Sequence, residues 1–163
     1  QPPLCKPAQS EQRIPLSRDF HSVITETDFF TILQKRTSQR FYRDEAMTLE
    51  QLSFLLWATQ GVKSIRGNHY ATLRTVPSGG ARHAFETYLA VRKVTGLSAG
   101  VYHYLPLEHA LEPIGPLENP QEQITAAMHG QKWAGNCAVA FLYSFVAYRA
   151  EWGGTAPAPI GWR

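Results

Sequence analysis

The chain has 163 residues, of which 44% are hydrophobic and 18% are charged, and its formal net charge is +3. These values are typical of one folded domain with a single sizeable core, and they give little support to a nucleic-acid-binding or membrane-surface protein because the basic residues are scattered. Two cysteines, Cys5 and Cys137, indicate neither a disulfide framework nor a paired-thiol metal site, and without a leader peptide or a bilayer-spanning run we expect a cytoplasmic protein.

Residues 1–26 are predicted to form an extended arm, because prolines stand among polar residues in its first part. The arm is expected either to wrap over a neighbouring surface or to stay mobile. The domain proper is predicted over residues 27–152, followed by an irregular tail at 153–163. A first helix is predicted from Asp28 to Lys35, with Thr27 as its N-terminal cap and an apolar stripe that includes Phe29.

The second predicted helix has the clearest boundaries in the sequence. Thr48 followed by Gln51 is typical of a capping box, and Gly61 stands where a left-handed C-terminal cap is expected. Three leucines are expected to pack one face of this helix on the core: Leu52, Leu55 and Leu56. Residues 63–73 are polar and are predicted to form a loop.

Alternating residues from Phe85 to Val94 and from Val101 to Leu105 predict an antiparallel hairpin, which residues 111–114 continue as a meander. Asn119 and Pro120 begin a further helix that ends near Gly130 and is expected to turn three side chains inward, Ile124, Ala127 and Met128.

Residues 137–146 are apolar almost throughout, which predicts a strand near the sheet centre that is covered on both faces. The order of elements indicates an α+β fold with a central mixed or antiparallel sheet flanked by helices.

A short loop ahead of the first predicted hairpin is a candidate ligand-binding edge. It consists of Pro77, Ser78, Gly79 and Gly80. Proline fixes φ and glycine lacks a Cβ, so the backbone of such a loop can contact a flat ligand directly. The alternative interpretation of the loop alone is an ordinary Pro-Ser-Gly turn.

The end of the first predicted helix is a candidate anion clamp. Arg36 and Arg40 offer forked donors that match phosphate oxygens, and Thr37 and Ser38 add hydroxyl groups. The alternative for this cluster alone is a solvated basic helix end.

Other patterns argue against several enzyme classes. Gly96-Leu97-Ser98-Ala99-Gly100 has the spacing of a hydrolase nucleophile elbow, but a strand pattern and not a helix follows it, so we interpret it as a hairpin turn. The six histidines show no metal-ligand spacing, so no metal site is expected, and neither a dinucleotide fingerprint nor a Walker loop occurs.

Taken together, these residues resemble the FMN-dependent nitroreductase superfamily and, within it, the SagB-type thiazoline/oxazoline dehydrogenase branch. The resemblance spans roughly residues 27–152. It is carried by four segments in order: Arg36-Thr37-Ser38-Gln39-Arg40-Phe41, the helix from Leu49 to Gly61, Arg74 to Arg82, and Gly96-Leu97 with Gly100 to Tyr104. Each motif alone is weak, and the four in this order are fairly specific.

The resemblance implies an FMN at the interface of a homodimer. Arg36, Thr37, Ser38 and Arg40 would lie near its phosphate and ribityl chain, and the loop of residues 77–80 from the partner chain would lie against its ring. The reaction would be ping-pong hydride transfer, with NAD(P)H as a transient donor and with small electron-poor compounds or azoline-containing peptides as substrates. No catalytic residue is assigned.

The resemblance breaks off after Glu151-Trp152, where Gly153-Gly154 replaces the expected continuation of that branch. We therefore expect a truncated or frameshifted reading frame, and an incomplete domain. The alternative to an enzyme is a non-catalytic or degenerate partner domain of the same fold without bound flavin.

Overall fold

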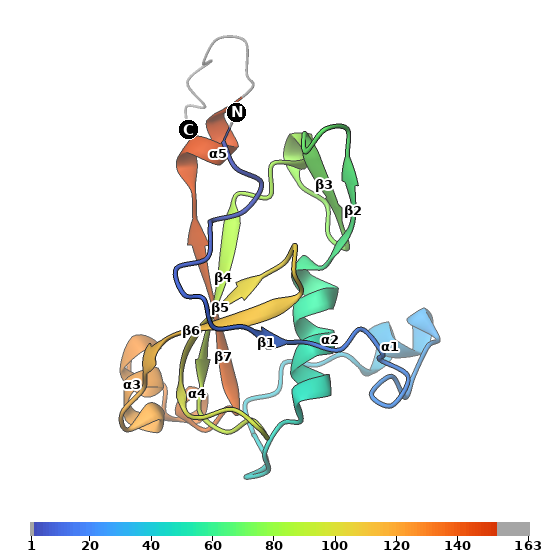
Figure 1. The fold of residues 1–163 in the computed structure, drawn as a ribbon. Helices are drawn as coiled ribbons and strands as arrows, with labels where there is room; N and C mark the ends of the chain where they lie inside the picture. Colours follow the sequence, from blue (N-terminus) through green and yellow to red (C-terminus); the bar gives the residue numbers. More distant parts are fainter. Residues whose placement is uncertain (1, 153–163) are drawn as a thin grey trace, which may run out of the picture.

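The computed structural model describes residues 2–152, so the tail predicted at 153–163 lies outside the described residues. Five strands form one sheet in the order β1-β6-β5-β4-β7, every neighbouring pair is antiparallel, and β2 and β3 form a separate hairpin (Figure 1). The strands are β1 Ile14–Pro15, β2 Val62–Arg66, β3 Ala71–Arg74, β4 Phe85–Val91, β5 Gly100–Leu105, β6 Ala110–Pro116 and β7 Val139–Phe145. The helices are α1 Phe29–Lys35, α2 Leu49–Gln60, the short 3-10 turn η1 Gly79–Ala81, α3 Pro120–Ala127, α4 Lys132–Gly135 and α5 Ala147–Glu151.

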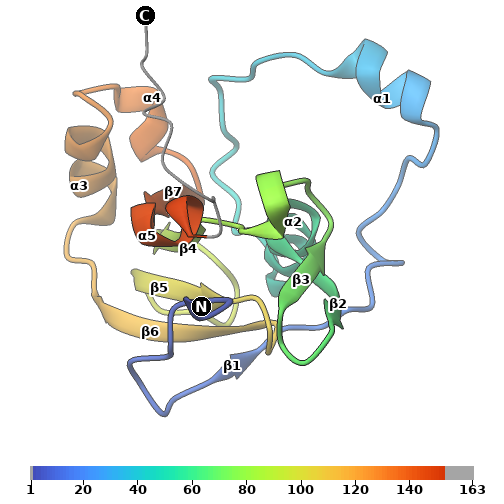
Figure 2. The ribbon, with the colours of Figure 1, turned by 90° about the horizontal axis from the view of Figure 1, so that it is seen from above.

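Strand β4 organises the core because both of its faces are covered. Leu89 belongs to a buried cluster with Leu52 and Leu56 of α2, whereas the next residue, Ala90, packs in a second cluster with Ile124 of α3. Successive side chains of a strand point to opposite faces, so α2 and α3 lie on opposite sides of the sheet (Figure 2). The predicted α+β fold, an antiparallel sheet flanked by helices, is confirmed.

The N-terminal arm wraps over the sheet, which is the first of the two alternatives. The backbone N–H of Lys6 donates to Oε1 of Glu86 at 2.8 Å, and those of Gln9 and Ser10 donate to Oε2 of Glu112 at 2.7 and 2.9 Å. Strand β1 then pairs with β6. Two carboxylates of the central strands therefore hold the arm in place.

Helix α1 is confirmed, but its predicted cap is wrong. Asp28 and not Thr27 is the cap, because the Asp28 carboxylate accepts from the backbone N–H of Thr31 at 2.7 Å. No residue of α1 is buried, and Phe29 and Phe30 are 71% and 67% exposed. The apolar stripe of α1 thus has no cover within the described chain.

Helix α2 confirms the capping box: Oγ1 of Thr48 accepts from the N–H of Gln51 at 3.2 Å, and Oε1 of Gln51 accepts from the N–H of Thr48 at 3.0 Å. The left-handed cap predicted at Gly61 is wrong, because its φ is −60° and its ψ is 131°. A Cβ at Gly61 would lie 2.5 Å from the carbonyl oxygen of Trp57. Glycine is needed at position 61 because a Cβ there would clash with Trp57, and not because the backbone is left-handed. Leu55 of the predicted packing face is exposed.

The loop predicted at residues 63–73 is wrong, since β2 and β3 form a hairpin there. All residues of β2 except Val62 are exposed, so the strand buries neither face and shows no hydrophobic alternation. Gly67, at φ +59°, lies in its turn.

The β4-β5 hairpin and its continuation into β6 are confirmed. The central position predicted for residues 137–146 is wrong within residues 2–152, where β7 pairs with β4 alone and stands at the edge of the sheet. Tyr143 and Phe145 are 49% and 57% exposed. An apolar run has the same sequence pattern in a central strand and in an edge strand, so periodicity alone could not distinguish the two positions.

Helix α3 begins at the predicted position, but Asn119 has a left-handed backbone at φ 45° and makes no side-chain capping bond. Ile124 is buried and Met128 packs on its cluster, as expected. Ala127 is exposed, contrary to the prediction.

Candidate functional site

A cavity of about 410 Å³ opens at the loop between β3 and β4. This volume lies within the range of small-molecule sites. The cavity is lined by Gln60, Val76, Pro77, Ser78, Gly79, Arg82, His83, Ala84, Phe85, Phe145 and Ala150. Three of the four predicted loop residues line it, and the fourth, Gly80, does not.

The loop is held at both ends by hydrogen bonds. The backbone N–H of Thr75 donates to the carbonyl of Gly61 at 2.9 Å, and the N–H of His83 donates to Oγ of Ser78 at 2.9 Å. Gly80 has φ +59°, a left-handed conformation that favours glycine. A Cβ on Gly79 would meet no atom within 4 Å, so the backbone there faces open space. The loop is therefore preorganised, and its backbone at Gly79 is accessible to a ligand.

An aromatic pair forms another wall of the cavity. Phe85 at the start of β4 is directly opposite Phe145 at the end of β7, and their ring centroids lie 5.3 Å apart. Both rings are about half exposed. The cavity therefore combines aromatic surface with a polar backbone edge, which suits a flat ring with hydrogen-bonding groups on one side.

His83 is a histidine of the cavity wall and is 7% exposed. Burial, followed by the positive charge of Arg74, lowers its pKa from 6.5 to about 4. The imidazole is therefore neutral at pH 7. The backbone carbonyl of His83 accepts a hydrogen bond from Nη1 of Arg149 in α5 at 2.9 Å, which connects the cavity wall to the last described helix.

A buried charge cluster lies beneath this region. Nδ1 of His103 is 2.7 Å from Glu112, and its Nε2 is 3.1 Å from Glu86, which Arg149 also bonds at 2.6 Å. Burial acts to lower the pKa of His103, but the hydrogen bonds to the two carboxylates outweigh it and raise that pKa. None of these side chains lines the cavity, so we assign the cluster to stability.

Ser53, His109 and Tyr104 form a second buried chain. Oγ of Ser53 is 2.9 Å from Nε2 of His109, whose Nδ1 is 2.7 Å from the Tyr104 hydroxyl. A serine beside a histidine is the pattern of an activated nucleophile, but all three side chains are at most 2% exposed. Because a substrate cannot reach these three side chains, we assign their hydrogen bonds to the stability of the core. Ser98 of the elbow pattern precedes strand β5, which confirms the hairpin-turn interpretation.

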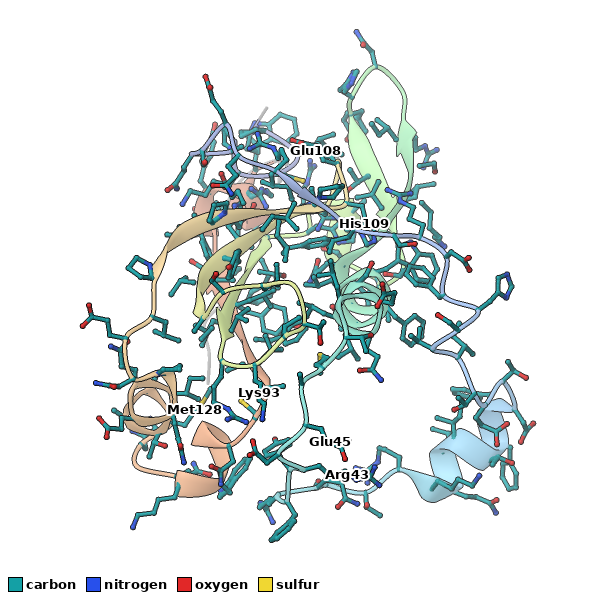
Figure 3. All side chains as sticks on the ribbon, turned by 60° about the horizontal axis from the view of Figure 1, so that its bottom comes forward. Arg43, Glu45, Lys93, Glu108, His109 and Met128 are labelled. Atoms are coloured by element: carbon teal, nitrogen blue, oxygen red, sulfur yellow. The ribbon has the colours of Figure 1, made fainter. Side chains whose placement is uncertain are left out.

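The predicted anion clamp lies elsewhere. Arg36, Thr37, Ser38 and Arg40 are exposed on the segment between α1 and α2. The guanidinium carbon of Arg40 lies 6.0 Å from the ring centroid of Trp133 in α4. Figure 3 marks the same segment by Arg43 and Glu45.

The two predicted halves of the site are not brought together in one chain. The clamp precedes the N-terminal end of α2, whereas Gln60, at the C-terminal end, lines the loop cavity. The 12 residues of α2 span about 18 Å. None of the four clamp residues lines that cavity.

Four loop residues of the site were predictable from the sequence, and the rest of the cavity wall was not predicted. Arg82 and His83 follow the loop directly, and their position within the same stretch was the available signal. Phe85 and Phe145 are 60 positions apart in sequence, and only the antiparallel register of β4 and β7 places them together.

Two kinds of feature are absent from residues 2–152. In this part of the chain, no group of three or more histidine, cysteine, aspartate or glutamate side chains could hold a metal ion. Nor does this part contain a helix long and apolar enough to cross a membrane.

Comparison with known proteins identifies relatives. Residues 33–162 match the model of the nitroreductase family. The chain is 39% identical over 105 residues to a Methanocaldococcus jannaschii protein named "Putative nitroreductase MJ1384", a match that covers 64% of this chain and 50% of the relative. It is 48% identical over 52 residues to "Trifolitoxin-processing protein TfxB" of Rhizobium leguminosarum bv. trifolii, covering 29% of this chain and 14% of the relative. The chain thus spans half or less of the length of these relatives.

Solved structures share the fold. A protein from Ralstonia eutropha JMP134, described as a putative nitroreductase, superposes with a TM-score of 0.60 at 25% identity, covering 92% of this chain and 71% of the other. A further structure is described as the E. coli microcin synthetase McbBCD complex with truncated pro-MccB17 bound. One of its chains superposes with a TM-score of 0.51 at 22% identity, covering 86% of this chain and 53% of the other.

Proposed function

Because the chain belongs to the nitroreductase family, we propose that it forms an FMN-dependent oxidoreductase in the cytoplasm. Proteins of this family generally use FMN and are often homodimers. The observation that carries the proposal is the cavity at residues 76–79, where bare loop backbone meets the Phe85–Phe145 pair. FMN, when bound, would supply ping-pong hydride transfer, with NAD(P)H as a transient donor.

The residues present fit the two ends of FMN chemically. Pro77, Ser78, Gly79 and Gly80 would hold the ring, because backbone N–H groups beside glycine can donate to its polar edge and Gly79 leaves that approach open. Arg36 and Arg40, with Thr37 and Ser38, would hold the phosphate. Neither arginine has a carboxylate within 4.0 Å among the described residues, so both guanidinium groups are free to bind an anion.

We propose that two chains complete each site. The clamp and the loop lie at opposite ends of α2, so a second copy is needed to bring a clamp to a loop. Unpartnered apolar surface supports association: Phe29, Phe30 and Leu33 of α1 are all more than half exposed. A homodimer of this kind would contain two equivalent sites related by a two-fold axis.

For the substrate, we propose an azoline-containing peptide, with small electron-poor compounds as the second class. The relative named as a trifolitoxin-processing protein and the shared fold with a microcin synthetase component support the peptide. The relative named as a nitroreductase supports the small compounds.

The test is the flavin content of the purified protein. We expect a yellow preparation that releases about one FMN per chain. The double variant Arg36→Ala/Arg40→Ala should keep its fold, because both side chains are exposed, and should lose FMN. Arg66→Ala, an exposed arginine of β2, is the matched control and should retain it. Colourless protein that takes up no added FMN would instead favour the non-catalytic partner domain.

A further inference from the structure

Arg74 is a buried guanidinium beside the loop cavity that has no carboxylate partner. The side chain lies at the end of β3, and the residue is 7% exposed. Its donors reach Oγ1 of Thr72 at 3.1 Å, Oε1 of Gln60 at 3.0 Å, and the carbonyl of Leu4 and Sγ of Cys5 in the arm at 3.4 and 3.3 Å. All of these acceptors are neutral groups. Among the described residues, no carboxylate lies within 4.0 Å of Arg74, although a buried charge is costly without an opposite one.

The nearby carboxylate that could balance Arg74 is already engaged. Burial lowers the pKa of Arg74, and Glu86 acts from a distance in the opposite direction by favouring the charged form. However, the oxygens of Glu86 accept from Arg149, from His103 and from the backbone of Lys6. Among residues 2–152, the positive charge of Arg74 therefore has no directly paired carboxylate.

A hydrogen bond to Gln60 connects Arg74 with the cavity wall. A guanidinium has donors only, so it bonds the oxygen of the Gln60 amide. The other end of that amide, Nε2, is a donor. Gln60 lines the cavity, so any hydrogen bond that it makes to a ligand through Nε2 is a donation to an acceptor.

Other residues of the cavity wall also favour a ligand that accepts hydrogen bonds or carries a negative charge. Arg82 lines the cavity and no aspartate or glutamate does. Burial is the first cause of the low pKa of His83, and the positive charge of Arg74 acts in the same direction, so the wall formed by the described residues contains no protonated histidine that a ligand anion would pair with. The Phe85–Phe145 pair supplies surface for a flat ring.

We propose that this cavity selects planar ligands that carry a negative charge, and that Arg74, acting through Gln60, determines this specificity. The inference rests on the proposed function, because it assigns the charge of the group bound at the same cavity. Two sources share this chemistry: the flavin ring in its reduced, anionic form, and an aromatic substrate that bears a carboxylate.

The first arm of the test compares 4-nitrobenzoate with 4-nitrobenzamide by calorimetry on the purified protein after removal of any flavin, because a bound flavin ring would occupy the same cavity. The two compounds have similar shape and differ in charge. We expect the wild-type protein to bind the anion about tenfold more tightly, the value of one charge-assisted hydrogen bond. Arg74→Gln should remove this preference, Arg74→Lys should keep part of it, and Arg66→Gln should leave it unchanged.

The second arm measures the midpoint potential of bound FMN. If the reduced ring is the anion, Arg74→Gln should shift the potential to more negative values, because the reduced form loses its counter-charge, and Arg74→Lys should restore part of the shift. A positive result in either arm supports the proposal and identifies the source.

Equal binding of anion and amide by the wild-type protein, together with an unchanged potential in Arg74→Gln, would overturn the proposal. A preference for the anion that Arg74→Gln retains in full would also overturn the role of Arg74, and if Arg74→Gln does not fold, Arg74→Lys decides the first arm because it should keep only part of the preference. If the protein binds no FMN, the proposed function fails, and the first arm alone then decides this inference.

Discussion

Nη2 of Arg149 in α5 donates to Oε1 of Glu86 in β4 at 2.6 Å, and both side chains are 4% exposed. Glu86 also bonds His103 and the backbone of Lys6, so one carboxylate joins the last described helix, the central sheet and the N-terminal arm. These hydrogen bonds outweigh the effect of burial and lower the pKa of Glu86, which keeps it charged.

Glu86→Gln should therefore destabilise the fold strongly. Arg149 would remain buried without its counter-charge, and we expect a loss of about 3 kcal/mol in the free energy of unfolding. Chemical denaturation measures this loss. The matched control is Glu108→Gln, which removes an exposed ion pair with Arg13 and should cost less than about 1 kcal/mol. Equal effects of the two substitutions would show that the buried cluster is not a centre of stability.

His83 should make the protein less stable in mild acid. Its pKa is about 4 in the folded protein and 6.5 when unperturbed, so the unfolded chain binds the proton first as the pH falls. Its stabilising contribution is fully present above pH 6.5 and is lost as the pH falls toward 4. The variant His83→Gln should show a shallower decline in unfolding free energy over this interval. If both proteins decline in parallel, His83 is not buried as a neutral group.

Thr48→Ala should cost about 1 kcal/mol of stability, because it removes the side-chain acceptor at the start of α2. The matched control is Thr27→Ala. Thr27 stands at the expected cap of α1, but Asp28 performs that role, so this substitution should have no measurable effect. Thermal unfolding distinguishes the two, and a loss at Thr27 would contradict the assigned cap.

Gly61→Ala should destabilise the protein by about 1–3 kcal/mol, because the added Cβ would lie 2.5 Å from atoms of Trp57 and force the backbone to shift. Gly115→Ala in β6 is the control, since its Cβ would meet no atom within 4 Å. Denaturant midpoints of the two variants provide the comparison. A tolerated alanine at Gly61 would mean that the turn into β2 is looser than described.

A site shared between two chains predicts complementation. Arg36→Ala/Arg40→Ala lacks the clamp, and Gly79→Val fills the cavity at a position with free space for a side chain, so each variant alone should fold and bind no FMN. Mixed after partial unfolding and refolding, they should form heterodimers with one intact site, which restores about a quarter of the sites in a random mixture. Flavin absorbance after gel filtration measures this. A mixture that stays colourless would place clamp and loop in the same site of one chain.

The local features of this protein could be predicted from adjacent residues. The capping box of α2 and the β4-β5 hairpin depend on residues within one or two turns of chain, so spacing alone identified them. The Pro77–Gly80 loop was recognised for the same reason, because proline and glycine restrict or free the backbone wherever they occur.

Only the tertiary structure decided which surfaces face one another. The apolar run of β7 predicted a central strand, yet β7 stands at the edge, because hydrophobic pattern does not record which partner covers a face. The pairing of Phe85 with Phe145 and the bond between Arg74 and Gln60 join residues far apart in sequence, and they exist through strand register and packing. The sequence therefore determined the loop and its backbone freedom, while the fold determined the aromatic wall and the burial of Arg74 beside it.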